Sequence, residues 1–76
     1  MEKVIGEVER SETEKIIVQV KEYKGRTYVD FRIHYLADED EWRPTQKGIT
    51  VAPALWEEFQ KHVSETNDFL TKEGLL

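Results

Sequence analysis

Tyrosines and basic residues surround a Lys24-Gly25 dipeptide in the middle of this 76-residue chain. Tyr23 precedes the dipeptide, Arg26 follows it, and Arg32 and Tyr35 come later in the same segment. Aromatic rings stack on the bases of an unpaired nucleic acid strand, while ammonium and guanidinium groups bind its phosphates. The residue types in this segment therefore indicate a surface for a single nucleic acid strand.

A second basic segment, with Arg43, Pro44 and Lys47, follows the acidic run at residues 38–41. We interpret the acidic run as a solvated turn, because it lacks the spaced ligands and the glycine of a calcium-binding loop. Arg43 and Lys47 are either plain solvated charges or phosphate contacts, and we favour phosphate contact.

The other candidate residues also have structural interpretations. Tyr23 could cover the stem of a neighbouring arginine, and Arg32 could form a weak surface ion pair with Asp30. Tyr35 falls on the apolar side of its strand by strict alternation, so it reaches a base only if the strand end twists or bulges. Both tryptophans, Trp42 and Trp56, are expected in the core or in a dimer interface.

The net charge of -5 argues against a nucleic acid partner, because nucleic-acid-binding proteins are usually basic. The distribution of charge weakens that objection. Residues 15–47 contain seven basic residues, and with the acidic run set aside only two acidic ones, so this stretch carries +5. Salt screens charges over roughly 8–10 Å, which lets a local basic patch act almost independently of distant acidic residues.

The length permits one domain, residues 1–76, with a core so small that we expect the chain to self-associate. No apolar run is long enough to span a bilayer, and the N-terminus does not resemble a signal peptide. We therefore expect an intracellular protein, in the cytoplasm or nucleoid of a prokaryote or the nucleus of a eukaryote.

Cysteine is absent, no third ligand accompanies Glu58 and His62, and no nucleophile lies beside a base. Neither a catalytic residue, a metal site nor a cofactor is predicted.

Period-2 alternation predicts two paired strands on either side of Lys24-Gly25. A two-residue loop there would pair Tyr23 with Arg26. Three opposed pairs are then apolar and share one face, and a slip by one residue would destroy this agreement. They are Val20 with Val29, Val18 with Phe31, and Ile16 with Ile33. A weaker first strand is expected over Lys3–Arg10 with a bulge at Gly6, and a short fourth strand over Gly48–Val51. Residues 37–47 are expected to form a loop.

A helix is predicted from Pro53 to about Lys72, with Gly74 as its stop signal. Ala52, at the expected cap position, is a poor N-cap. The apolar positions recur at spacings of three and four residues and form one stripe. They are Trp56, Phe59, Val63, Thr66 and Leu70.

The ordered set of motifs resembles the C-terminal domain of transcriptional positive cofactor 4, a family of single-stranded-DNA-binding coactivators. The resemblance runs from about Val18 to Val63 and depends on three segments. They are Lys24-Gly25, Val29-Asp30-Phe31-Arg32, and Pro44-x-x-Lys47-Gly48-Ile49-Thr50 continuing through Pro53 to Trp56.

The resemblance implies an α+β fold, a curved four-stranded antiparallel sheet packed on one C-terminal helix. It also implies a homodimer made through the helices and last strands. The DNA-binding positions carried over from the family are Tyr23, Lys24, Arg26, Arg32, Tyr35, Arg43 and Lys47. Tyr23 and Tyr35 stand where larger or more apolar rings are common, and Gln46 replaces a usual cation. No segment of residues 1–76 resembles the Ser- and Lys-rich regulatory tail of eukaryotic members, so the resemblance does not imply a coactivator role that needs that tail.

These observations favour a homodimer that binds single-stranded DNA with little sequence preference, in transcription regulation or in DNA replication and repair. The transcription machinery is a further candidate partner. One alternative is a dimeric protein-interaction module whose acidic surface recruits a partner. Another is a single-stranded RNA binder, because base stacking serves both kinds of strand.

Overall fold

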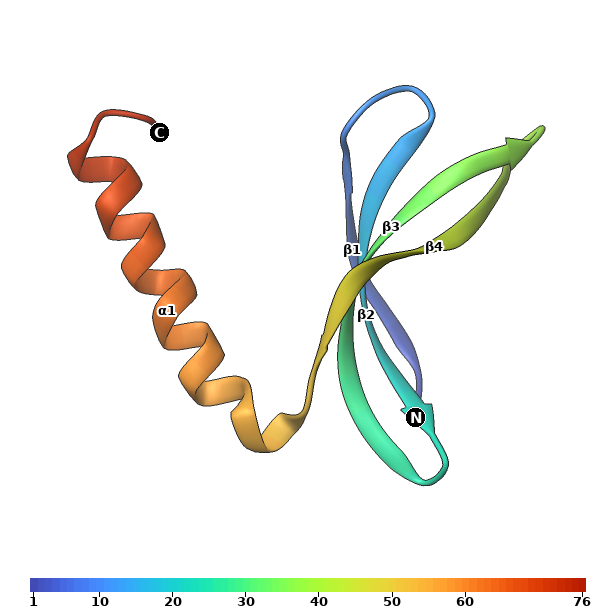
Figure 1. Cartoon of the computed structure of the whole chain (residues 1–76), viewed down its shortest axis with the longest axis horizontal. Coiled ribbons are helices and arrows are strands. Elements are labelled where there is room, and N and C mark those ends of the chain that lie inside the picture. Colours follow the sequence, from blue (N-terminus) through green and yellow to red (C-terminus); the bar gives the residue numbers. More distant parts are fainter.

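The computed structural model describes residues 1–76 as four strands and one helix (Figure 1). The strands follow one another as an antiparallel meander in the order β1-β2-β3-β4, so β1 and β4 form the edges. The elements are β1 (Lys3–Glu9), β2 (Glu14–Tyr23), β3 (Arg26–Asp38), β4 (Glu41–Val51) and α1 (Pro53–Lys72). This confirms the predicted four-stranded antiparallel sheet with a C-terminal helix.

The β2–β3 hairpin has the predicted register. Tyr23 pairs with Arg26, Val18 with Phe31, and so on along both strands without interruption. Lys24 and Gly25 form the two-residue turn with φ angles of 51° and 78°. Two successive positive φ angles give the turn whose twist matches that of the flanking strands, and glycine adopts such an angle without steric cost.

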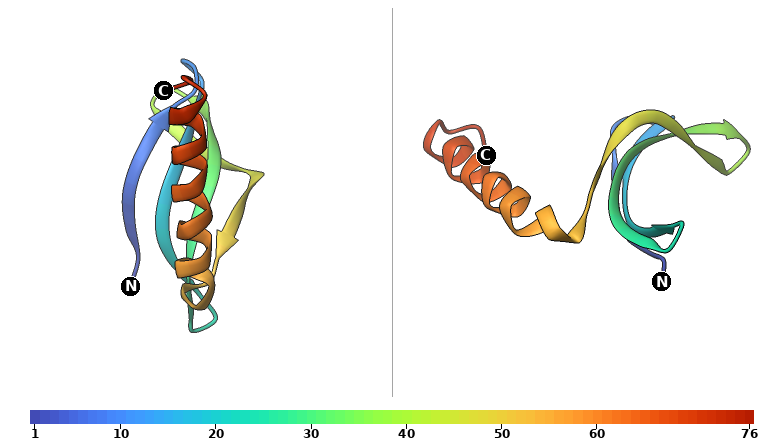
Figure 2. Two further views of the ribbon diagram at one scale, coloured as in Figure 1. Left: turned by 90° about the vertical axis from the view of Figure 1, so that its left-hand side faces the viewer. Right: turned by 60° about the horizontal axis from the view of Figure 1, so that its bottom comes forward.

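The register divides the sheet into two faces. The apolar face carries Val18 and Phe31, and the polar face carries Gln19 and Asp30, each a directly opposed pair. The sheet is curled, and α1 stands on the outer side of the curl (Figure 2). Because Phe31 stacks on Trp56 of α1, the apolar face is the outer one and the polar face is the inner one. The predicted bulge in β1 is confirmed, as its register shifts between Val4 and Gly6.

The expected loop over residues 37–47 is wrong. Strand β3 continues to Asp38, and β4 begins at Glu41 and runs through Pro44. The acidic run turns at Glu39 and Asp40, where Asp40 has a φ of 60°. Proline is tolerated in β4 because an edge strand leaves one row of N–H groups without partners.

The predicted helix is confirmed at both ends. Pro53 occupies the first turn, and Ala52 makes no side-chain capping hydrogen bond. Gly74 has a φ of 70°, and the N–H of Leu75 donates to the carbonyl of Leu70. This left-handed glycine closes the helix and satisfies one of its last carbonyl groups.

The implied packing of the sheet on its own helix is only partly present. Trp56 and Phe59 in the first two turns contact Phe31, with ring centroids 6.1 and 5.5 Å from it. Beyond these turns α1 extends away from the sheet (Figures 1 and 2), and Val63 is 53% exposed. The radius of gyration is 14.6 Å, whereas a compact chain of this length has one of about 11 Å. A large part of the apolar stripe therefore has no cover within the chain.

The helix is too polar to span a membrane, and no other helix is present.

Candidate nucleic-acid interface

The tip of the β2–β3 hairpin presents an aromatic ring among cations. The Tyr23 side chain is 62% exposed, and the Lys24 ammonium lies 5.3 Å from the centre of its ring. Arg26 is exposed directly opposite Tyr23 on the polar face. None of the pairs of aromatic rings in the molecule includes Tyr23, and its exposed ring is open to stack on a base.

The cations near this tip have no carboxylate partner. Lys21, Lys24 and Arg26 take part in none of the ion pairs of the molecule, and the same is true of Lys47. Each of these charges is therefore available to a phosphate without displacing an acid of the chain. Three of these four cations belong to the hairpin, which therefore carries local positive charge despite the overall charge of -5.

Arg32 is held inside the sheet rather than free on its surface. Its Nε and Nη2 groups donate to the buried carboxylate of Asp30, and Nη1 donates to the carbonyl of Thr45 at 2.9 Å. The side chain is 22% exposed. A guanidinium carries five N–H donors, and these bonds use three of them, so two remain for a phosphate. Arg32 thus holds β4 through its bond to Thr45 and still has two N–H groups that can donate to a phosphate.

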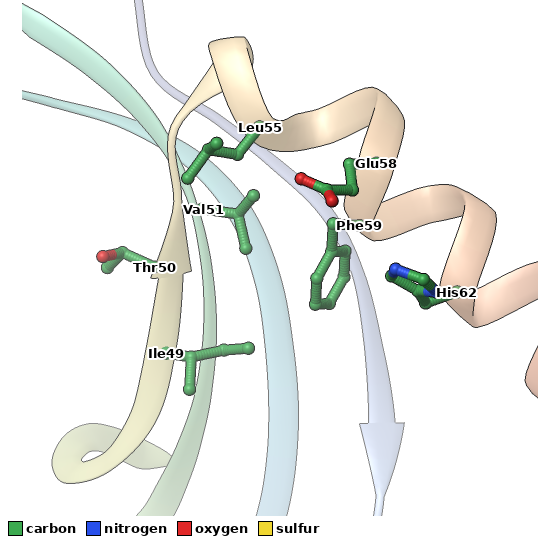
Figure 3. Close-up of a pocket in the computed structure, with 7 residues that line it drawn as sticks. All are labelled: Ile49, Thr50, Val51, Leu55, Glu58, Phe59 and His62. Atoms are coloured by element: carbon green, nitrogen blue, oxygen red, sulfur yellow. The ribbon is translucent and has the colours of Figure 1, made fainter.

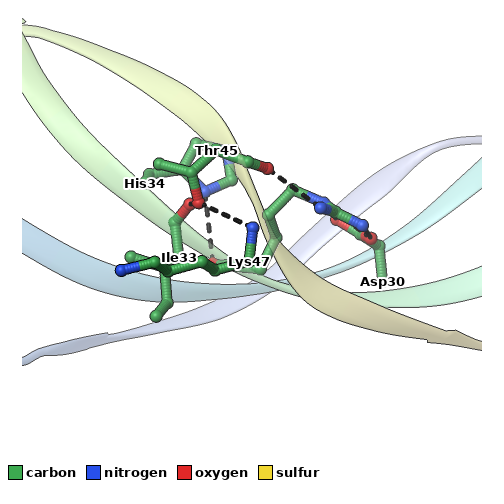
Figure 4. A network of polar contacts seen from close by, with 6 residues as sticks. Asp30, Ile33, His34, Thr45 and Lys47 are labelled. Atoms are coloured by element: carbon green, nitrogen blue, oxygen red, sulfur yellow. Dashed lines mark hydrogen bonds and ion pairs between the residues drawn. The ribbon is translucent and has the colours of Figure 1, made fainter.

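Strand β4 contains a bulge, and Lys47 is part of it. Between the pairs Arg32–Gly48 and His34–Pro44 the register shifts, so residues 45–47 face Ile33 alone. The Thr45 hydroxyl donates to the carbonyl of Ile33 and accepts from the backbone N–H of Lys47 (Figure 4). Bulges redirect side chains out of the regular ladder. The basic segment that the sequence indicated as a loop is therefore a hydrogen-bonded bulge.

Gly48 lies directly beside the Arg32 side chain and the β3 backbone, which leave no room for a Cβ atom. A Cβ atom at this position would lie 2.4 Å from the Phe31 carbonyl oxygen and 3.1 Å from Cζ of Arg32. Only glycine allows the two strands and the guanidinium to approach this closely. The glycine that follows Lys47 is therefore explained by steric limits at this position.

Tyr35 and Arg43 form a separate group at the other end of β3. They are directly opposed in the ladder, and Tyr35 is 40% exposed. Alternation along β3 places both on the side of Ile33, which is the apolar face, as strict alternation predicted for Tyr35. Arg43 donates to Glu41 at 2.9 Å in an exposed pair.

The seven predicted positions therefore form two groups rather than one. Tyr23, Lys24 and Arg26 make up the hairpin group, whereas Tyr35 and Arg43 make up the arm group; Arg32 and Lys47 lie between them on β3 and β4. Figure 1 shows strands that fan out at both ends from a narrow middle, as in a strongly twisted sheet. Because of this twist, the direction in which each face points changes along β3, between the hairpin group and the arm group.

Sequence reasoning missed one cluster on the polar face. The Lys15 ammonium lies 4.3 Å from the centre of the Trp42 ring and 2.7 Å from the Glu7 carboxylate. Trp42 is half-buried there, so the expectation of a core position is only partly met. No sequence signal pointed to this contact, because it joins three strands across the curl of the sheet.

Open apolar cavities line the outer face. One of about 360 Å³ lies between β4 and α1 and is bordered by Ile49, Val51, Leu55 and Phe59 (Figure 3). A second, of about 450 Å³, has mainly apolar walls that include Val18, Val29 and Trp56. Neither cavity contains a cluster of acidic and histidine side chains that could hold a metal ion.

Several solved structures resemble this chain. A PC4 homolog from Burkholderia pseudomallei is 29% identical over 86% of this chain and 88% of its own, with a TM-score of 0.78. A bacteriophage T5 homolog of the eukaryotic transcription coactivator PC4, implicated in recombination-dependent DNA replication, is 27% identical over 97% and 83%, with a TM-score of 0.67. MoSub1, solved in complex with DNA, is 23% identical over 91% and 84% with a TM-score of 0.65, which supports the fold alone.

The family model described as Transcriptional Coactivator p15 (PC4) matches residues 10–62. This match covers more than half of the chain and includes the hairpin group, the arm group, the β4 bulge and the start of the helix. The chain therefore belongs to the Transcriptional Coactivator p15 (PC4) family.

Proposed function

We propose that this protein binds single-stranded DNA as a homodimer, with little dependence on sequence. The observation that carries the proposal is Tyr23, an exposed ring between two cations that no carboxylate neutralises. Base stacking on such a ring is tolerant of sequence because every base has a π face. Duplex DNA offers no free base faces along its length, which favours a single strand as the ligand.

The path of the strand follows from the two groups. It stacks on Tyr23 at the hairpin, crosses the β4 edge near Arg32 and Lys47, and reaches Tyr35 and Arg43 on the other face. The twist of the sheet supports this path, and so does the position of β4 at an edge with no further strand beyond it. The seven predicted side chains then act together although the sheet separates them.

The homodimer is supported by surface that the single chain leaves uncovered. Its accessible area is 6364 Å², whereas a compact monomer of 9.0 kDa exposes about 4,850 Å². The excess is about 1,500 Å² per chain, or about 3,000 Å² for two chains, which lies within the range of obligate dimer interfaces. We assign this interface to the apolar stripe of α1 and the open cavity between β4 and α1.

Family membership supports a role in transcription regulation or in DNA replication and repair. The implication of the bacteriophage T5 relative in recombination-dependent replication agrees with the second of these roles. In either role, we expect the ligand to be transiently unpaired DNA.

A salt-dependent titration tests the proposal. Fluorescently labelled single-stranded DNA, matched duplex DNA and matched RNA are titrated with the protein at several salt concentrations. The four unpaired cations, together with Arg32 and Arg43, allow four to six phosphate contacts. The logarithm of affinity should then fall against the logarithm of salt concentration with a slope of about -3 to -4.

Stronger binding of single-stranded DNA than of duplex supports the proposal. A preference for duplex, or an affinity that does not change with salt, would contradict it. Stronger binding of RNA would move the ligand to single-stranded RNA, and absence of binding to all three at low salt would favour a protein-interaction module instead.

A further inference from the structure

Lys15 links three strands on the inner face of the sheet. It lies in β2, its ammonium pairs with Glu7 of β1, and it lies over the Trp42 ring of β4. Its side chain is only 13% exposed, compared with 47% for Glu7. A lysine held this closely in a face otherwise open to solvent has a defined position rather than a solvated one.

The contact with Trp42 passes over β3. Strands in a sheet lie about 4.8 Å apart, so β2 and β4 are separated by roughly 10 Å at their backbones. In the ladder Lys15 pairs with His34, whereas Trp42 pairs with Leu36 two residues further along β3. Lys15 therefore reaches diagonally across the curl to the part of the β3–β4 hairpin that carries the arm group.

This part, residues 35–43, is called the β3–β4 arm, and in the ladder only its Tyr35 pairs with β2, at Glu14. In Figure 1 it diverges from the β1–β2 turn at the upper end of the sheet. The only backbone hydrogen bond outside the regular ladders that joins the arm to the β1–β2 turn runs from the Leu36 N–H to the Thr13 carbonyl. Cation–π contacts gain strength when they are shielded from water, as this one is.

We propose that Lys15 is a positioning residue, which fixes the β3–β4 arm and thereby sets the separation of Tyr35 from Tyr23 along a bound strand. The inference depends on the proposed function. Nine residue steps along β3 separate Arg26, the ladder partner of Tyr23, from Tyr35, which corresponds to roughly 30 Å. A strand that contacts both rings binds tightly only when this distance is fixed beforehand, because a mobile arm must be ordered on binding.

The test compares long and short oligonucleotides, because only a long one reaches both groups. Thymidine oligonucleotides of about 16 and about 4 nucleotides represent the two ends of the range for single-strand binding sites. Lys15→Met retains the stem and removes the charge. It should weaken binding of the long oligonucleotide about threefold to tenfold and leave binding of the short one at the hairpin unchanged.

Three further variants separate positioning from folding and from direct contact. Lys15→Arg keeps a cation over the ring and should restore binding of the long oligonucleotide. Trp42→Leu should reproduce the loss, and combining it with Lys15→Met should add nothing, because both changes remove the same contact. Glu7→Gln should weaken only the long oligonucleotide, since Glu7 orients Lys15.

Equal losses for both lengths in Lys15→Met would overturn the positioning role, and so would the absence of any loss. A gain in affinity for both lengths in Glu7→Gln would show that Lys15 contacts phosphate directly and would also overturn it. If the unaltered protein binds neither oligonucleotide, the proposed function fails and the inference fails with it. Binding by the unaltered protein with no effect of Lys15→Met would overturn the inference alone.

Discussion

Removing the ring of Tyr23 together with the charge of Lys47 should weaken binding of single-stranded DNA at least tenfold. Tyr23 is 62% exposed, and Lys47 forms no ion pair. Stacking of one base on an aromatic ring is worth about 1–3 kcal/mol, which is a factor of about 5 to 150 in affinity. Loss of one phosphate contact adds to this and lowers the steepness of the salt dependence.

The fold should tolerate the double change Tyr23→Ala, Lys47→Ala. The exposed Tyr23 ring takes part in no pair of aromatic rings, and the hydrogen bond that Lys47 makes within the bulge uses its backbone N–H. Fluorescence anisotropy with a labelled oligonucleotide measures the affinity, and circular dichroism monitors the fold. The matched control Tyr23→Phe, Lys47→Arg keeps a ring and a charge at the same positions and should bind nearly as well as the unaltered protein.

A folded double-alanine variant that retains full affinity would refute the reasoning, because it would remove the most exposed ring and an unpaired cation from the proposed path without effect. Equal losses in the alanine variant and in the matched control would also count against it. That result would assign the losses to disturbance of the strands rather than to stacking and charge.

Three other variants test separate parts of the account. Glu41→Gln removes the exposed partner of Arg43 and should raise affinity severalfold at low salt, an effect that titration at high salt should abolish; a loss of affinity would contradict the phosphate role of Arg43. Val63→Asp places a charge on the uncovered stripe of α1 and should lower the mass measured by analytical ultracentrifugation from that of two chains to one, whereas Lys61→Asp, on the opposite side of the helix, should not. Gly48→Ala should lower the free energy of unfolding by about 1–3 kcal/mol, because its Cβ would lie 2.4 Å from a backbone oxygen; unchanged stability in urea would show that β4 can shift without cost.

The sequence predicted the β2–β3 hairpin fully because two independent signals agreed there. Alternation on both strands and the Lys24-Gly25 turn allow one register only, and Val18 opposite Phe31 is its consequence. The helix was equally predictable, since Pro53 and Gly74 mark its ends. Local chemistry dictates these elements, and no distant contact overrides it.

The extent of β4 could not be predicted in the same way. Its bulge at residues 45–47 breaks the alternation, and Pro44 suggests a loop unless the strand is known to be an edge. The bonds of Arg32 to Asp30 and Thr45 depend on that bulge, so the partly structural role of Arg32 was also hidden. These features arise from strand pairing over distance rather than from residue spacing.

The position of the helix was the least predictable feature. An apolar stripe shows that a helix needs a partner, but it does not show whether the partner is its own sheet or another chain. Phe31 and Phe59 are in contact, yet Val63 is not covered. The separation of Tyr23 and Tyr35 onto different faces was visible in the alternation, and the resemblance to a family did not remove it.

Photochemical crosslinking tests the central claim most directly. A single-stranded oligonucleotide that contains halogenated uracil is irradiated with the protein, and the modified residues are identified by mass spectrometry. The account predicts crosslinks to Tyr23 and Tyr35, which excess unlabelled single strand suppresses and duplex does not. Crosslinks confined to α1 or to β1, with neither tyrosine modified, would contradict it.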